Sequence, residues 1–455
     1  MGEETLFEMP ESRAPESVVP TRPEEARLLR ACREQVEWAP RSLEATIPQD
    51  HPVRAIWAML EKLDLSAFYT SIKAVLGRPG HPTTDPQVLL GLWLYATAEG
   101  VGSARQLARL CEEHDAYRWL RGGVPTNYHT LSDFRVAHQA ALDSLLTETL
   151  ASMMVEGLVS LRHVTQDGMR TRASAGAGSF RRKETLEGCL TEARKQVEEL
   201  AKEREHPDSG VSRREQAARE RAAREREARV EEALRRLPAL KAAKERQSKT
   251  LSKDKRAKVS EPRASTTDPD ATVMKMPDGG FRPAYNLEVA TDVDSQVIVG
   301  VGVVTTGSDG GQALPVAEQV QARAGVLPQA YLMDGGFASR GDITALDQKG
   351  IVVYAPTRPP RTTTSGRTEA DPRPDDTPEV ANWRARMQTE EAKEVYKERA
   401  ATAECANAQL RRYGLRQLLV RGKGKVLSVL LLAAVTHNLL RWITLTSVLS
   451  GAASG

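Results

Sequence analysis

Three acidic residues stand where carboxylates could bind a metal ion, although they lie far apart in the chain: Asp167, Asp334 and Glu404. Asp334 ends the strand-like stretch YLMD and precedes two glycines, and Asp167 ends the similar stretch RHVTQD before a glycine. Glu404 lies among small residues in a predicted helix, and no other acidic residue lies between Arg399 and the C-terminus. Asp-Gly is also a common turn dipeptide, and a single glutamate is usually solvent-exposed. Each residue alone therefore favours a structural interpretation.

Together the three carboxylates would support phosphoryl transfer. Mg²⁺ prefers oxygen ligands and retains waters, so two or three carboxylates can hold two ions beside phosphate oxygens. One ion generates and orients a hydroxide or 3′-hydroxyl nucleophile, and the other stabilises the leaving oxygen. Such a site needs no histidine base, and none of the eight histidines forms a convincing triad with a serine or cysteine. No Walker-type glycine loop is present.

The order of predicted elements brings these carboxylates together. The strand at 162–168 precedes a hairpin at 285–293 and 296–304, a helix at about 311–324 and the strand that ends at Asp334. A helix, the strand IVVYAP and a long helix at about 388–411 follow. This is the order of a ribonuclease-H-like α/β fold interrupted by an insertion. In that fold the first and fourth strands are neighbours, which predicts that Asp167 and Asp334 lie side by side.

The N-terminal part of the chain is predicted to be helical. Asp85 and Pro86 supply an N-cap and a first-position proline for PQVLLGLWLYATA, and Ser103 can cap ARQLARLCEEH after the break EGVGS. This outline is typical of a helix-turn-helix, although many helical domains share it without binding DNA. A third long helix is predicted at about 132–157.

Charge is distributed unevenly in a chain of 455 residues with a formal net charge of only +3. Residues 184–247 are predicted to form two charged helices, broken at HPDSG (206–210) and kinked near Pro238, and residues 248–263 to be basic and loose. Seven Lys/Arg oppose Glu404 alone within 401–445, including Arg411, Arg412 and Arg416. Two basic regions favour a polyanion partner, and a solvated helix face is the alternative.

The protein is predicted to be cytoplasmic. Its four cysteines are far apart, which favours a reducing compartment over a disulfide framework or zinc site. The first 30 residues, acidic and proline-rich, do not read as a signal peptide. The most apolar run, VLSVLLLAAV at 426–435, is shorter than a membrane span and is predicted to be a buried helix.

On these residues, the chain resembles the DDE transposases of bacterial insertion sequences over about 45–445. It is most similar to members with a helical N-terminal domain and a catalytic domain split by a charged insertion. The most specific stretches are VTQDGMRTRASA, ASTTDPDATVMKMPDGGFRPAYNLEVATD, YLMDGGF and YKERAATAECANAQLRRYGLRQLLVRG. The last resembles the family's Tyr–Arg–Glu–Lys signature. Four residues separate Arg399 from Glu404 where the best-known members have three, and Arg411 replaces the lysine.

The resemblance implies that Asp167, Asp334 and Glu404 bind two Mg²⁺ ions, with Mn²⁺ as a substitute. It also implies that Tyr396, Arg399 and Arg411 contact transposon-end phosphates or brace Glu404. The basic C-terminal region adds Arg412 and Arg416 as predicted DNA contacts. The expected partners are terminal inverted repeats and target DNA, bound by a homodimer at the nucleoid. Phe337, the aromatic residue nearest Asp334, is predicted to belong to the core.

The predicted function is DNA cleavage at insertion-sequence ends followed by strand transfer. The alternatives are a nuclease that uses water only and an inactive DNA-binding or scaffold protein on the same fold. The predicted domains are a flexible N-terminal segment (1–44), a helical domain that binds DNA ends (45–158), a ribonuclease-H-like catalytic domain (159–183 and 264–445), an inserted charged arm (184–263) and a tail (446–455).

Overall fold

The computed structural model describes residues 40–74, 82–205, 212–249, 261–357, 371 and 373–453. Residues Leu43–Gly455 form one compact unit. Nearly all of the predicted N-terminal segment 1–44, the HPDSG break and most of the predicted basic segment 248–263 lie outside the described residues.

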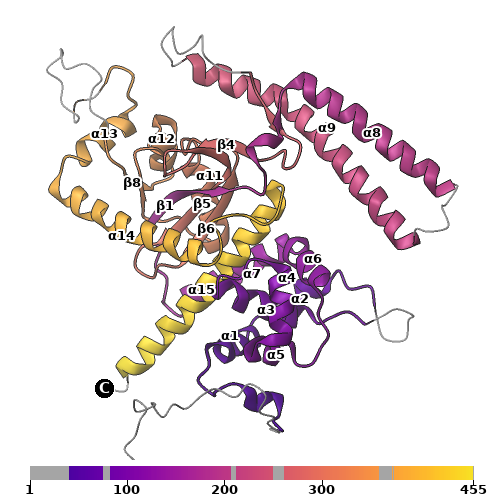
Figure 1. The fold of residues 1–455 in the computed structure, drawn as a ribbon. Helices are drawn as coiled ribbons and strands as arrows, with labels where there is room; N and C mark the ends of the chain where they lie inside the picture. Colours follow the sequence, from indigo (N-terminus) through magenta and orange to yellow (C-terminus); the bar gives the residue numbers. More distant parts are fainter. Residues whose placement is uncertain are drawn as a thin grey trace, which may run out of the picture. The chain divides into compact units, whose positions relative to one another are not determined.

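A six-stranded sheet lies at the centre of the C-terminal part (Figure 1). Its strands are β1 (His163–Arg172), β4 (Thr272–Lys275), β5 (Phe281–Asp292), β6 (Ile298–Val304), β7 (Ala330–Met333) and β8 (Val352–Tyr354). The path β4-β5-β1-β7-β8 is extended by β6, which pairs with β5. β5 is antiparallel to β1 and β6, whereas β7 is parallel to β1 and β8. The prediction of a mixed α/β fold with a helical N-terminal part is confirmed.

β1 is longer than the sequence predicts. The expected strand ends at Asp167, but β1 continues to Arg172, so Asp167 lies within the strand. The reason is the length of β5, which pairs with β1 from Val164 to Arg172. Only the parallel pairing with β7 stops at Gln166. The prediction that β1 ends at Asp167 is wrong.

Helices pack around the sheet and supply its connections. They are α11 (Ala313–Ala324), α12 (Arg340–Gln348), α13 (Pro378–Arg386), α14 (Glu390–Arg412) and α15 (Lys423–Ala453). All but α13 were predicted, within one to three residues at most ends. α13, which was not predicted, has Thr377 as its N-cap and Pro378 at its first position. α14 contacts β1, β5, β7 and β8, so it crosses the strands that carry the two aspartates.

The N-terminal part is a set of helices: α1 (Pro52–Leu60), α2 (Ser66–Tyr69), α3 (Pro86–Ala98), α4 (Ala104–Glu113), α5 (Asp115–Arg121), α6 (Tyr128–Ala137) and α7 (Gln139–Val155). The predicted caps of α3 and α4 are confirmed, because Asp85 accepts from the Gln87 amide and Ser103 from the Gln106 amide. The predicted single helix at 132–157 is wrong. It divides at His138, whose backbone leaves the helical region.

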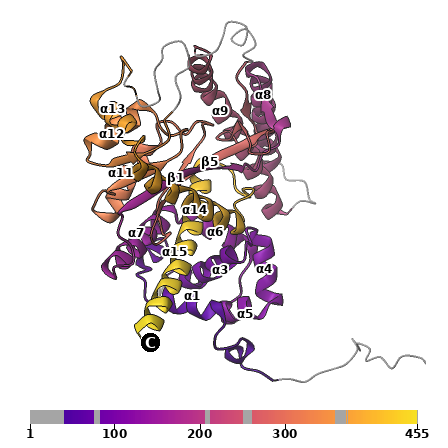
Figure 2. The ribbon, with the colours of Figure 1, turned by 90° about the vertical axis from the view of Figure 1, so that its left-hand side faces the viewer.

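α15 joins the helical part to the sheet, since it contacts α7, α3 and α6 as well as β6 (Figure 2). It is long and apolar enough to cross a membrane by composition, but 72% of that window is buried within the protein. The predicted buried helix is therefore confirmed, and it is longer than the apolar run alone indicated.

The charged insertion forms two helices, α8 (Lys183–Glu205) and α9 (Arg213–Lys249), which lie against each other (Figure 1). α9 continues through Pro238. Many of its charges pair within the hairpin, as Arg194 does with Glu227 and Glu231. A small apolar cluster at its base contains Leu186, Val230 and Leu237. The base also contacts β3 (Ala264–Ser265), the partner of β2 (Phe180–Arg181).

Candidate active site

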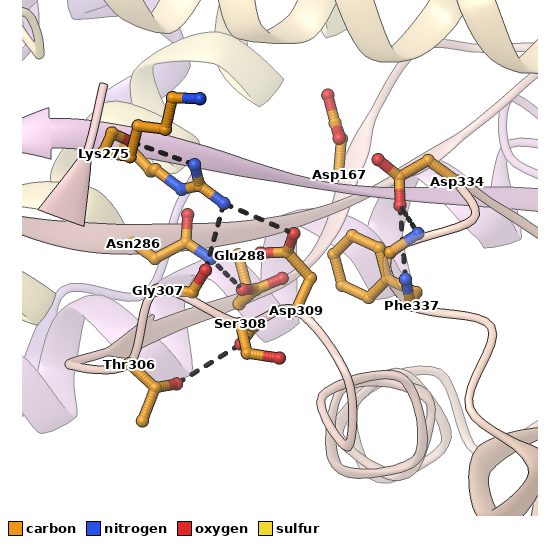
Figure 3. A network of polar contacts seen from close by, with 12 residues as sticks. Asp167, Lys275, Asn286, Glu288, Thr306, Gly307, Ser308, Asp309, Asp334 and Phe337 are labelled. Carbon is orange, nitrogen blue, oxygen red and sulfur yellow. Dashed lines mark hydrogen bonds and ion pairs between the residues drawn. The ribbon is translucent and has the colours of Figure 1, made fainter. Parts of the chain in front are cut away.

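Asp167 and Asp334 lie next to each other where β1 and β7 part. The parallel register pairs His163 with Ala330 and ends with Gln166 opposite Met333. The next residue of each strand is an aspartate, so the two carboxylates leave the sheet at the same level (Figure 3). Burial raises the pKa of Asp167, and the negative charge of nearby Asp334 raises it further. The predicted neighbourhood of the two residues is thus found in the structure.

Asp334 also organises its own turn. Its Oδ1 accepts hydrogen bonds from the backbone amide of Gly336 at 2.6 Å and from that of Phe337 at 3.2 Å. A Cβ at Gly336 would lie 2.9 Å from that same oxygen, which explains the glycine at this position. Phe337 is fully buried, as predicted for a core residue. The turn engages Oδ1 of Asp334 and keeps the carboxylate at the rim of the sheet.

Two side chains of α14 bind both oxygens of Asp167. Arg399 donates to Oδ1 at 3.2 Å, and Asn407 donates to Oδ2 at 2.7 Å. Ala403 and Ala406 face the sheet between them and are buried. Their small side chains let the helix approach β1 closely. The sequence predicted α14 and its proximity to the site, but it did not single out Asn407.

The electrostatics around Asp167 reflect a local excess of negative charge. Burial raises the pKa of Asp167, Asp334 and Asp309 raise it further, and Arg399 lowers it. Only Arg399 forms an ion pair with this carboxylate among the described residues. A cation between Asp167 and Asp334 would relieve the same repulsion, and their hard oxygen donors suit Mg²⁺ or Mn²⁺. The residues present therefore fit a divalent metal.

Glu404 is placed differently from the two aspartates. Its side chain is exposed on α14, one helical turn before Asn407. Within the described ranges, no group of three or more His, Cys, Asp or Glu residues has the arrangement of a metal site. The structure thus brings Asp167 and Asp334 together and leaves Glu404 on the exposed side of α14.

A buried polar network lies beneath the aspartate pair, on the side of Gly168 and β5. Asn286 donates to Glu288 and to Asp309, both at 2.7 Å (Figure 3). The Asp309 carboxylate fits against two glycines: a Cβ at Gly168 would lie 3.0 Å from its Oδ1, and one at Gly336 3.2 Å from its Oδ2. Both glycines follow the predicted metal ligands closely in sequence. The larger side chains of most residues would displace Asp309.

Sequence reasoning missed Glu288 and Asp309. Glu288 is the one acidic residue within the apolar stretch YNLEVA, and an acid inside a strand that is otherwise buried was the available signal. It is fully buried and accepts from Gln166 at 2.9 Å. Asp309 lies in TTGSDGG, which has the composition of an ordinary turn. Nothing in that stretch indicates that its carboxylate returns to the sheet.

Glu288→Gln is expected to flatten the pH dependence of stability. Burial raises the pKa of Glu288 to about 8, from 4.5. The folded chain therefore holds a proton there that the unfolded chain releases, and the free energy of unfolding falls as pH rises between these values. The loss amounts to roughly several kcal/mol above about pH 8, at 1.4 kcal/mol per pKa unit. The glutamine keeps the shape without the ionisation, so the variant gains most over wild type at high pH.

Urea unfolding with EDTA at about pH 5 and about pH 9 measures this difference without interference from metal ions. The matched control is Glu203→Gln, since Glu203 is exposed on α8. A wild-type curve as flat as that of Glu288→Gln would contradict the prediction.

The predicted DNA contacts fall into two groups. Arg399 is partly buried against Asp167, and Tyr396, one turn earlier, is half-buried and has its pKa raised by burial. Arg411, Arg412 and Arg416 are exposed at the end of α14 and just beyond it. They form no ion pair in the part of the chain that the structure describes, which leaves their charges available to an anion.

Comparison with known families finds two matching regions in the chain. Residues 41–137 match a transposase domain (DUF772), and residues 361–443 match a transposase DDE domain. Both matched regions are transposase domains, which supports a DDE transposase of an insertion sequence. No curated protein and no solved structure matches it.

The two matches cover different parts of the chain. The first spans the N-terminal helices from α1 to α6, and the second spans α13, α14 and most of α15. Glu404, Arg399 and Asn407 therefore lie within the DDE match, whereas Asp167 and Asp334 lie outside it. The evidence for Asp167 and Asp334 as site residues is instead the register of β1 and β7, which places them next to each other.

Proposed function

We propose that this transposase cleaves DNA at the ends of its insertion sequence and joins the freed 3′-hydroxyl to target DNA. The observation that carries the proposal is the adjacent pair Asp167 and Asp334, crossed by the helix of the DDE match. The strand order β6-β5-β1-β7-β8, with β7 and β8 parallel to β1, supports a ribonuclease-H-like catalytic domain.

Asp167, Asp334 and Glu404 are the proposed metal ligands. When bound, one or two divalent ions would supply Lewis-acid stabilisation of the charge that develops on phosphate oxygens. Asp167 and Asp334 offer fixed oxygens at the sheet rim, and exposed Glu404 can swing toward them without breaking a contact seen in the described residues. Arg399 compensates the charge of Asp167 until DNA and metal are bound.

The DNA backbone is proposed to run past the end of α14. Arg411, Arg412 and Arg416 place three cations at a helix C-terminus, and arginine binds phosphate bidentately. Inverted repeats and target DNA are the proposed partners, and joining two ends calls for a homodimer. The proposed domains are the helical region at 45–158, the catalytic region at 159–183 and 264–445, and the arm at 184–263.

Replacing Arg411, Arg412 and Arg416 together by alanine is expected to weaken DNA binding at every sequence tested. The logarithm of the binding constant falls with the logarithm of salt concentration, and each lost phosphate contact makes this slope shallower by roughly 0.9. The triple alanine variant should therefore have a slope that is smaller in magnitude by up to about 3. Fluorescence anisotropy across a salt series measures this slope. The triple lysine variant retains the charges and keeps the slope, and an alanine variant with an unchanged slope would refute the contact.

The test of the reaction uses labelled DNA that carries the repeats flanking the protein's own gene, with Mg²⁺ or Mn²⁺. Cleavage at the repeat boundary followed by products longer than the substrate supports transposition. Cleavage that yields only shorter products shows a nuclease that uses water. Retarded DNA without any cleavage, under either metal, points to a binding protein that has lost catalysis.

A further inference from the structure

Asn407 is a second, unpredicted polar residue on the inner face of α14. On the basis of the proposed function, we propose that Asn407 is a positioning residue, whose amide fixes Asp167 and the register of α14 against β1. Through that register it sets where Glu404 lies. Its role is separate from metal ligation, because it acts on the carboxylate of Asp167.

The contact is short and enclosed. Nδ2 of Asn407 lies 2.7 Å from Oδ2 of Asp167, and the residue is only 6% exposed. Arg399 takes the other oxygen, Oδ1, at 3.2 Å. The carboxylate is therefore bound on both sides by the same helix, which fixes its rotation as well as its position.

The spacing of the two donors along α14 means that these contacts fix the position of the helix along β1. Arg399 and Asn407 are eight residues apart, about 12 Å along a helix, yet both reach one carboxylate. They converge from opposite ends on the level of Ala403, and Glu404 is the next residue. A slide of α14 by one turn would break both contacts and carry Glu404 about 5.4 Å away from the level of Asp167.

The chemistry of the amide suits this role. An amide donates a hydrogen bond without adding charge, whereas a carboxylate here would add to the repulsion between Asp167 and Asp334. Oδ1 of Asn407 is buried and has no partner in the described part of the chain. Among the described residues, the side chain of Asn407 therefore hydrogen-bonds only to Asp167. A buried acceptor without a partner costs stability, so a role at the site explains this asparagine better than a contribution to stability does.

The experiment compares Asn407→Leu with wild type in Mn²⁺ binding, measured by electron paramagnetic resonance on the full chain without DNA. Residues that orient metal ligands typically contribute about 10- to 100-fold to metal affinity, and a loss in that range is expected. The Mn²⁺ concentration for half-maximal cleavage should rise by the same factor, while the rate at saturating Mn²⁺ recovers. Asn407→Gln, which retains the amide, should restore part of the affinity.

Gln409→Leu is the matched control, because Gln409 lies on the same helix about 160° around the axis from Asn407. Unchanged Mn²⁺ affinity in Asn407→Leu would overturn the inference. If Asn407→Leu does not fold, Asn407→Gln decides by the same measurement. Its amide is one methylene further from the backbone, so wild-type Mn²⁺ affinity and wild-type metal dependence of cleavage in this variant would overturn the inference. Asp167→Asn separates the two proposals: if that variant also binds Mn²⁺ normally, the proposed metal site itself fails.

Discussion

Asp334→Asn is expected to reduce cleavage at the repeat boundary by roughly a thousandfold or more. Metal ions contribute several kcal/mol of charge stabilisation to phosphoryl transfer, and each 1.36 kcal/mol corresponds to a factor of ten in rate. The asparagine retains Oδ1, so the hydrogen bonds from Gly336 and Phe337 persist and the turn survives. What disappears is the negative charge beside Asp167. The loss therefore falls on the chemical step.

Single-turnover cleavage of labelled DNA at saturating protein measures this effect without a contribution from DNA affinity. DNA binding and the urea midpoint of Asp334→Asn should match wild type. Asp294→Asn is the control, because Asp294 is an exposed aspartate paired with Arg162 away from the sheet rim. Cleavage by Asp334→Asn at the wild-type rate would remove Asp334 from the proposed site.

Asp334 is a cleaner choice for this test than Asp167. Replacing Asp167 removes at once the charged partner of Arg399 and the one hydrogen bond that the Asn407 side chain makes in the described part of the chain. A partly buried guanidinium without its partner is costly, so Asp167→Asn combines a structural loss with a catalytic one. Both aspartates belong to the same carboxylate pair, so the different structural cost of the two substitutions comes from the contacts that each side chain makes.

Sequence patterns predicted the elements of the sheet better than the contacts of the site. Period-two alternation found β5 and β6, and the Asp-Gly stretches found β7 and part of β1. The extent of β1 could not be predicted, because it depends on how far β5 continues as its partner. The local signal at Asp167-Gly168 is that of a turn, and pairing with Glu288 and Val289 overrides it.

The inner face of α14 illustrates a second limit. The sequence marks Glu404 as the sole acidic residue of its region, and that reasoning depends on charge alone. Which residues of a helix face a sheet depends on its rotation, and α14 turns Asn407 toward Asp167 and Glu404 toward solvent. The position of Asp309 could not be predicted from the sequence either. Its carboxylate reaches the sheet only because the folded loop brings it against Gly168 and Gly336.

α15 contributes a different kind of support, because it satisfies the backbone of the β5–β6 hairpin. Asn438 accepts from the amide of Ile298 and donates to its carbonyl, both at 2.8 Å. One turn along, Arg441 donates to the carbonyl of Ser295, and His437 Nε2 bonds the carbonyl of Gln296 at 2.8 Å. The helix thus covers the edge strand β6, and its side chains pair with backbone groups at that edge.

Asn438→Leu is expected to destabilise the protein by roughly 2 to 6 kcal/mol. The substitution leaves both the amide and the carbonyl of Ile298 unpaired in a fully buried place, and each unmet group costs about 1–3 kcal/mol. The apolar leucine has nearly the same volume, so a cavity contributes little. The effect should appear as a lower urea midpoint and as faster hydrogen exchange in a peptide that contains Ile298.

Asn127→Leu is the matched control for that substitution. Asn127 is exposed and caps α6 by accepting from the Thr130 amide, so its loss leaves a donor that water can satisfy. An N-cap contributes about 1 kcal/mol, which is well below the loss expected at Asn438. Equal destabilisation by the two variants, or unchanged exchange at Ile298, would mean that α15 does not close the edge of β6. A larger loss at Asn438 ties the sheet that carries Asp167 to the same helix that packs against α7 and α3.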